Sequence, residues 1–205
     1  MGCAAFLTPP DRASCRGFLL QQSGVVPGRD GRMQQRRLQV YTGAGKGKTT
    51  AAAGLAARAL GHGWRVLWVR LLKPAALQAG EVTSLSRFPG FELLDAGIGV
   101  IAGSASVEEV AASVQRVFAA ARVRIASGDL DLVVFDEING AVRRNALPLA
   151  ELLDLLDQRP PALEIVLTGR DAHPQVLLRA DLVTEMMAIK HPLAQGIAAR
   201  QGIEY

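Results

Sequence analysis

A glycine-rich run that follows an apolar stretch constrains the fold of this chain more than any other feature. Residues 43–49 read Gly-Ala-Gly-Lys-Gly-Lys-Thr and come directly after the apolar segment 38–42. Glycines allow consecutive backbone N–H groups to converge on one anion. A helix that begins at Thr49 would direct its free N–H groups and the positive end of its dipole at the same point. The run therefore predicts a strand, a phosphate-binding turn and a helix, which is a unit of parallel α/β sheets.

We call residues 43–49 the P-loop. Lys48 is expected to reach the phosphates of a nucleoside triphosphate, and the Thr49 hydroxyl is expected to bind Mg²⁺. The run departs from the pattern G-x-x-x-x-G-K-[ST], because Thr42 stands where the first glycine falls and a second lysine, Lys46, lies inside the loop. The alternative is a structural turn without a ligand, in which both lysines would be poorly placed. The loop residues expected to bind ATP are Gly43, Ala44, Gly45, Lys46, Gly47, Lys48, Thr49 and Thr50.

Apolar runs and helical patterns alternate from residue 38 onward. Several runs are continuously apolar, which is typical of parallel strands covered on both faces. The pattern predicts the α/β class, with a doubly wound, mostly parallel sheet of the P-loop NTPase type flanked by helices. The expected strands are 38–42, 65–72, 91–94, 130–135, 164–168 and 183–187, and the expected helices are 49–60, 107–126, 149–156 and 174–179.

The first 36 residues differ from the rest of the chain. They mix Pro, Gly, Ser and Arg without periodicity, which predicts a disordered N-terminal extension before a single domain over residues 37–205. Translation from Met33 is an alternative start. Cys3 and Cys15 both fall in this extension, so the domain has neither a disulfide framework nor a cysteine metal site, and we expect a cytoplasmic protein.

Composition argues against two classes of partner. Aromatic residues make up 5% of the chain and the arginines are scattered, so no platform for stacking nucleic-acid bases is expected. No apolar run has the length of a membrane span, and no membrane partner is expected. The net charge of +4 is compatible with a small anionic ligand.

Two later segments carry candidate site residues. The apolar run 130–135 ends in Asp136 and Glu137, and acids at the carboxyl edge of a sheet beside a P-loop are expected to hold Mg²⁺. Two solvated acids at a strand end are the alternative. After the run 164–168, the guanidinium of Arg170 is expected to reach the phosphates. His173 and His62 are expected to be capping residues, and Trp64 and Trp68 to be core residues.

Four segments together resemble the ATP:corrinoid adenosyltransferases of the CobA/BtuR type. They are 42–50, Val133-Val134-Phe135-Asp136-Glu137, Thr168-Gly169-Arg170 with His173, and the C-terminal Lys190-His191, Ala194–Ile197 and Gly202–Tyr205. The resemblance covers residues 38–205 in order, and the shifted P-loop with its extra lysine is the family's own variant. It implies transfer of the 5′-deoxyadenosyl group of ATP to a Co(I) corrinoid, with release of triphosphate. It also implies Mg²⁺, a homodimer and an electron-donor flavoprotein.

The chain departs from this family at two places. Ala44 stands where the family usually has Asn, and the family's corrinoid-facing Phe-x-Trp stretch has no counterpart in residues 97–103. Ile98, Val100 and Ile101 are the expected corrinoid-facing residues instead. Two alternatives stay open: an ATPase or kinase that cleaves the terminal phosphate, and a nucleotide- or corrinoid-binding protein without turnover.

Overall fold

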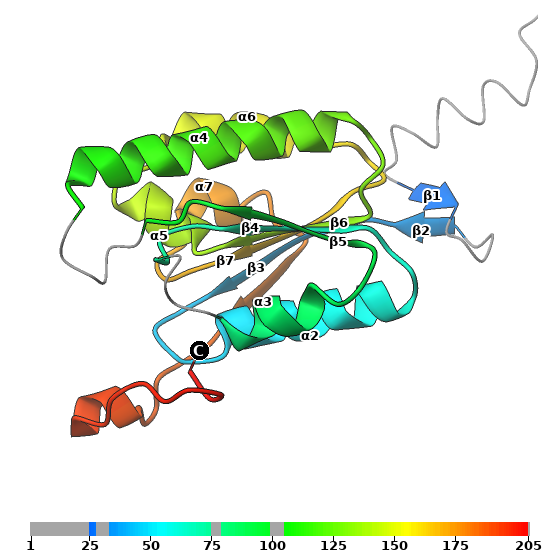
Figure 1. Ribbon diagram of the computed structural model, residues 1–205. Helices are drawn as coiled ribbons and strands as arrows, with labels where there is room; N and C mark the ends of the chain where they lie inside the picture. Colours follow the sequence, from blue (N-terminus) through cyan, green and yellow to red (C-terminus); the bar gives the residue numbers. More distant parts are fainter. Residues whose placement is uncertain (1–24, 28–32, 75–78, 99–104, 205) are drawn as a thin grey trace, which may run out of the picture.

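A six-stranded parallel sheet forms the centre of the molecule (Figure 1). The computed structural model describes residues 25–27, 33–74, 79–98 and 105–204. The strand order is β5-β4-β6-β7-β3-β8, and every pair of neighbours is parallel. In chain order the strands are β3 (Leu38–Thr42), β4 (Val66–Arg70), β5 (Phe91–Asp95), β6 (Leu132–Asp136), β7 (Glu164–Thr168) and β8 (Leu182–Glu185).

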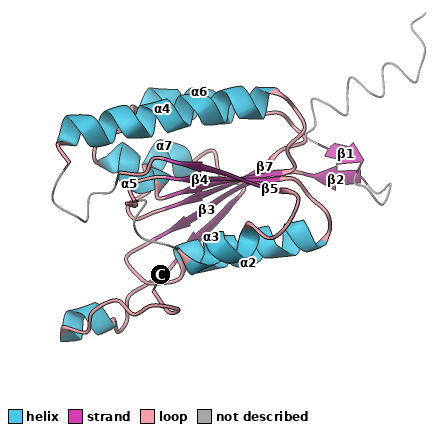
Figure 2. Ribbon diagram, in the orientation of Figure 1, coloured by secondary structure: helices cyan, strands magenta, loops and turns pink. Residues whose placement is uncertain are grey.

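Helices cover both faces of this sheet, as Figure 2 shows, so the doubly wound α/β architecture is confirmed. The helices α2 (Lys48–Gly61) and α3 (Gly80–Leu85) lie on one face. The other face carries α4 (Val107–Ala126), α5 (Ile138–Arg143), α6 (Leu149–Asp157) and α7 (Pro174–Leu177). A 3₁₀ helix, η2 (Pro192–Gln195), follows the last strand.

Local sequence explains the main elements. All residues of β4 and β6 are buried, because helices cover both faces of a central parallel strand. Helix α2 brings the small side chains Ala52 and Ala56 against the sheet. Helix α4 begins with a capping box, in which Ser106 and Glu109 each bond the other's backbone N–H.

The predicted strands are confirmed, with ends that differ by up to two residues, but two short helices were missed. Helix α5 contains Asn139 and Gly140, which are poor helix formers. It forms because Ile138, Ala141 and Val142 are buried against the core, so tertiary packing overrides propensity. Helix α3 begins after Ala79, and an alanine at the N-cap position gives no capping signal.

Two short strands lie within the segment that we expected to lack regular structure. The strands β1 (Val25–Pro27) and β2 (Met33–Gln35) pair antiparallel, while residues 1–24 and 28–32 lie outside the described part of the chain. The guanidinium of Arg36 lies 3.7 Å from the centre of the Trp64 ring. The division of the chain at residue 36 stays a prediction. Trp68 is fully buried, as expected of a core residue.

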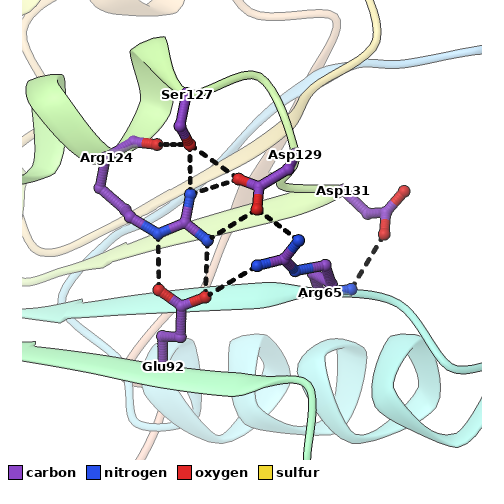
Figure 3. Close-up of polar contacts among 6 residues, drawn as sticks. All are labelled: Arg65, Glu92, Arg124, Ser127, Asp129 and Asp131. Carbon is purple, nitrogen blue, oxygen red and sulfur yellow. Dashed lines mark hydrogen bonds and ion pairs between the residues drawn. The ribbon is translucent and has the colours of Figure 1, made fainter.

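A network of charged side chains ties together the amino-terminal edge of the sheet (Figure 3). Arg124 of α4 makes a two-point ion pair with Glu92 of β5, at 2.7 and 2.6 Å, and also contacts Asp129. Arg65, which precedes β4, bridges Glu92 and Asp129. The backbone N–H of Arg65 donates to Asp131, which precedes β6. These contacts connect strand starts, and the opposite edge of the sheet carries the P-loop.

Candidate nucleotide site

Polar side chains follow four neighbouring strands at the carboxyl edge of the sheet. The P-loop follows β3, Lys73 follows β4, Asp136 ends β6 and Thr168 ends β7. The register pairs Arg70 with Asp136 across β4 and β6, which brings the residues after β4 close to this carboxylate. Loops at the carboxyl ends of parallel strands are where ligands bind in open α/β sheets.

The P-loop needs glycine for two separate reasons. Gly43 and Gly47 have φ angles of 94° and 118°, which side-chain-bearing residues rarely adopt. A Cβ atom on Gly45 would lie 2.7 Å from the Met186 carbonyl oxygen. The backbone after β8 therefore packs directly on the loop.

Two hydrogen-bond donors of the P-loop, the Lys48 ammonium and the Gly45 N–H, are bound to backbone carbonyl oxygens. Lys48 donates from Nζ to the carbonyl oxygens of Gly43 and Gly45, at 2.8 and 2.6 Å. The Gly45 N–H donates to Met186 O at 2.6 Å. Burial, with a smaller contribution from the Arg170 charge, lowers the pKa of Lys48. A phosphate group bound at this loop would have to replace these acceptors.

The extra lysine of the loop contacts the C-terminal segment. Lys46 Nζ lies 2.9 Å from Glu204 Oε1, and in Figure 1 this segment passes beside the loop between β3 and α2. Hydrogen bonds from Arg200 and then from Lys46 lower the pKa of Glu204 to about 2. Sequence reasoning did not connect these residues, because they are separated by 158 positions.

Asp136 is the centre of the site. Its side chain is fully buried, and its Oδ1 accepts hydrogen bonds from the hydroxyls of Thr49 and Thr168, each at 2.8 Å. Its Oδ2 accepts from Lys73 Nζ at 2.6 Å. The structure thus brings together Thr49 and Asp136, two of the three predicted metal residues. It adds Thr168 and Lys73 to them.

Glu137 lies next to this cluster in a left-handed conformation, with a φ of 66°. Its N–H donates to Thr168 Oγ1 at 2.9 Å. Burial and then the Asp136 charge raise the pKa of the Glu137 carboxyl, against the charges of Lys73, Lys48 and Arg170. Among the described residues, none donates a hydrogen bond to this carboxylate, so its oxygens are available to a ligand.

Lys73 is a site residue that the motifs did not identify. Its ammonium lies between Asp136 and Glu81, whose Oε1 is 4.0 Å away. Burial lowers the pKa of Lys73, but the charge and hydrogen bond of Asp136 outweigh burial and raise it overall. The available signal was its position just after a buried strand, since such positions meet at one edge of a parallel sheet.

A cavity of about 380 Å³ opens beside these groups. Helix α2, helix α3 and the C-terminal segment form its walls, so elements distant in sequence enclose it. Its lining residues are Thr49, Thr50, Ala53, Lys73, Gly80, Glu81, Ser84, Gly202, Ile203 and Glu204.

The oxygen ligands fit Mg²⁺. This ion usually takes one or two carboxylates together with substrate phosphates and water. The described ranges hold no cluster of three or more His, Cys, Asp or Glu residues able to bind a metal. Asp136, Glu137 and the Thr49 hydroxyl are the oxygen groups at this edge that could hold such an ion. Asp136 already holds a cation, the Lys73 ammonium, so its position suits positive charge.

The other predicted residues have varied surroundings. Arg170 is exposed after β7, and its phosphate role stays a prediction. Ile98 is half-buried against the main core, while Val100 and Ile101 lie outside the described residues. His173 caps α7 by accepting from the Gln175 N–H at 3.2 Å, and His62 is the C-cap of α2, as expected for both.

Within the described ranges, no helix combines the length and apolar character that a bilayer crossing requires.

Comparison with known proteins assigns the chain to a family. Residues 34–205 match the family described as ATP:corrinoid adenosyltransferase BtuR/CobO/CobP. The corrinoid adenosyltransferase of Pseudomonas aeruginosa is 37% identical over 171 residues, which cover 82% of this chain and 83% of that protein. Those of Escherichia coli and Salmonella typhimurium are each 37% identical over 166 residues, which cover 81% of this chain and 84% of each relative. This chain therefore belongs to the ATP:corrinoid adenosyltransferase family.

Proposed function

We propose that this chain binds Mg-ATP at the carboxyl edge of its sheet and transfers the 5′-deoxyadenosyl group to the Co(I) centre of a reduced corrinoid. The observation that carries the proposal is the hydrogen bond between Thr49 at the end of the P-loop and the buried Asp136. This contact unites a phosphate-binding loop and a buried carboxylate in one site, within a chain of this family.

The reaction needs little covalent chemistry from the protein. The Co(I) electron pair attacks the C5′ carbon, the Co–C bond forms, and the C5′–O bond breaks so that triphosphate leaves with its electron pair. Because Co(I) is itself the nucleophile, neither a protein nucleophile nor a general base is required. The chain contributes by positioning C5′ and by stabilising the negative charge on the leaving group.

The P-loop residues 43–49, with Thr50 and Arg170, would hold this leaving group. Lys46 and Lys48 are the loop's two cations, and each must exchange its present acceptor for a phosphate oxygen. Thr49, Asp136 and Glu137 would hold Mg²⁺. When bound, Mg²⁺ would neutralise part of the triphosphate charge. The half-buried Ile98, with Val100 and Ile101, would contact the corrinoid.

Three further proposals concern the surroundings of the reaction. A flavoprotein would supply electrons to cobalt, and the reducing cytoplasm would be the compartment. A homodimer is supported by the apolar side chains exposed on and around the edge strand β8, where 43% of Leu182, 47% of Val183 and 76% of Met187 is accessible. Exposed apolar patches of this kind often mark protein interfaces.

One anaerobic experiment tests the activity against both alternatives. Purified protein is mixed with Mg-ATP and a chemically reduced corrinoid, while the cobalt spectrum and the phosphate products are followed. Adenosylcorrinoid with an equal amount of triphosphate is the expected result. ADP or free phosphate without adenosylation would instead indicate an ATPase or kinase, and binding without any product would indicate a homologue that lacks turnover.

A matched pair of variants links the activity to the site. Lys48→Ala removes the buried P-loop cation and is expected to abolish triphosphate release. Arg58→Ala removes an exposed cation in the last turn of α2, away from the P-loop, and is expected to retain the wild-type rate. Equal rates in the two variants would contradict the assignment of the P-loop as the ATP site.

A further inference from the structure

We propose that Lys73 is a phosphate-binding residue that is released by a divalent cation. Its ammonium pairs with Asp136 in this structure, and it leaves Asp136 when the cation binds there. The proposal rests on the proposed function, because it concerns the same Mg-ATP site. It adds a third cation to the two of the P-loop, from a different strand of the sheet.

The backbone directs Lys73 toward Asp136. The preceding residue, Leu72, has a φ of 58°, and a left-handed conformation in a bulky residue persists only where surrounding structure enforces it. Leu72 is buried in the main core, which supplies that enforcement. The chain therefore turns sharply after β4, and the Lys73 side chain is left only 22% exposed.

The two oxygens of Asp136 have different partners. Two neutral hydroxyls donate to Oδ1, whereas a charged ammonium donates to Oδ2. On the Oδ2 side, a divalent cation that approaches this carboxylate meets the like charge of Lys73. Because like charges repel strongly at contact distance in a partly buried site, Lys73 and the cation compete for this oxygen.

The displaced ammonium would lie where the triphosphate is expected. Lys73 lines the same cavity as Thr49 and Thr50 of the first turn of α2. Its other carboxylate neighbour, Glu81, lies on the cavity wall 4.0 Å away. A lysine ammonium is a compact charge on a flexible stem, so a rotation of this side chain toward the cavity can bring it to the phosphate oxygens. In its present position, the same charge neutralises the buried Asp136.

This exchange predicts opposite changes in two affinities when the lysine charge is removed. In Lys73→Met, Mn²⁺ alone is expected to bind about tenfold more tightly or better, because its competitor is gone. Tripolyphosphate in the presence of saturating Mg²⁺ is expected to bind about tenfold more weakly or worse, because one cationic ligand is lost. Mn²⁺ binding is measured by electron paramagnetic resonance and tripolyphosphate binding by calorimetry.

Two further variants complete the design. Arg58→Met removes an exposed cation in the last turn of α2 and is expected to leave both affinities within about twofold of wild type. Lys73→Arg keeps the charge and is expected to retain weak Mn²⁺ binding. A Lys73→Met protein with unchanged Mn²⁺ affinity, or with unchanged tripolyphosphate affinity, would overturn the proposal.

A measurement on the wild-type protein covers the case in which Lys73→Met does not fold. The lysines of the chain are Lys46, Lys48, Lys73 and Lys190, so the side-chain ¹⁵N resonances of selectively labelled protein are few. Mg²⁺ is expected to shift the Lys73 resonance before any phosphate is added, and an unchanged resonance at saturating Mg²⁺ would refute the exchange. None of these measurements uses a corrinoid, so a failure of adenosyl transfer is observed separately.

Discussion

Thr168 provides the sharpest test of how the site is held together. Its hydroxyl donates to Asp136 Oδ1 at 2.8 Å and accepts from the Glu137 N–H at 2.9 Å. The side chain is fully buried, so no water replaces a lost partner there. Thr168→Val has almost the same shape but lacks the hydroxyl, and it removes both bonds at once.

The cost can be worked from these two bonds. A hydrogen bond to a charged group contributes about 1.5–3 kcal/mol, and a buried N–H left without an acceptor costs about 1–3 kcal/mol. The added methyl group of valine recovers about 0.8 kcal/mol. We therefore expect the free energy of unfolding of Thr168→Val to be about 3 kcal/mol below that of wild type.

Urea unfolding measures this difference. With a slope of about 2 kcal/mol per molar urea, the midpoint is expected to fall by roughly 1.5 M. Thr168→Ser is the matched control, because it keeps the hydroxyl and loses only a buried methyl group, at a cost of about 1 kcal/mol. Coinciding midpoints for the two variants would refute the reasoning, since they would show that the hydroxyl contributes nothing.

Three other outcomes follow from the site and from the charged network. Burial holds the pKa of Glu137 above its usual value, so the stability of the wild-type protein falls as the pH rises through the folded-state pKa. Metal-free Glu137→Gln should therefore melt at a higher temperature than wild type at neutral pH, but not in acid. Gly45→Ala places a Cβ 2.7 Å from a backbone carbonyl oxygen and should lose ATP binding in calorimetry. The control is Gly54→Ala, which has open space around the new Cβ. It should bind ATP normally and raise the free energy of unfolding by about 0.5–1 kcal/mol. The hydrogen bond from Arg124 lowers the pKa of Asp129 to about 2. This acid therefore contributes stability that is present above its usual pKa and lost as the pH falls toward 2. In Asp129→Asn, the melting temperature should fall less steeply as the pH is lowered than it does in wild type.

The strands and the P-loop were predictable because each has a local cause. Continuous apolar runs such as the one that ends at Phe135 in β6 predict buried parallel strands. The carboxyl ends of parallel strands meet at one edge of the sheet, so acids that follow one strand are expected near a loop that follows another strand. Thr49 and Asp136 do lie in hydrogen-bond contact, although they are separated by 87 positions.

The remaining site contacts depend on three-dimensional packing. Lys73 reaches Asp136 because Leu72 is forced into a left-handed turn, and nothing in the local sequence specifies that turn. Glu204 reaches Lys46 only after the C-terminal segment crosses the loop. The short helix α5 contains weak helix formers and is stabilised by burial. In each case, contacts with residues distant in the sequence determine the conformation.

The strand order has a consequence for synthesis of the protein. Strand β3 carries the P-loop near the start of the domain, yet its two neighbours, β7 and β8, are translated last, with Leu38 paired to Ile165 and Gln39 to Leu182. Such long-range pairings make folding slow. We therefore expect the proposed nucleotide site to be complete only after β7 and β8 have left the ribosome, so that ATP would stabilise the sheet from that point on and not before.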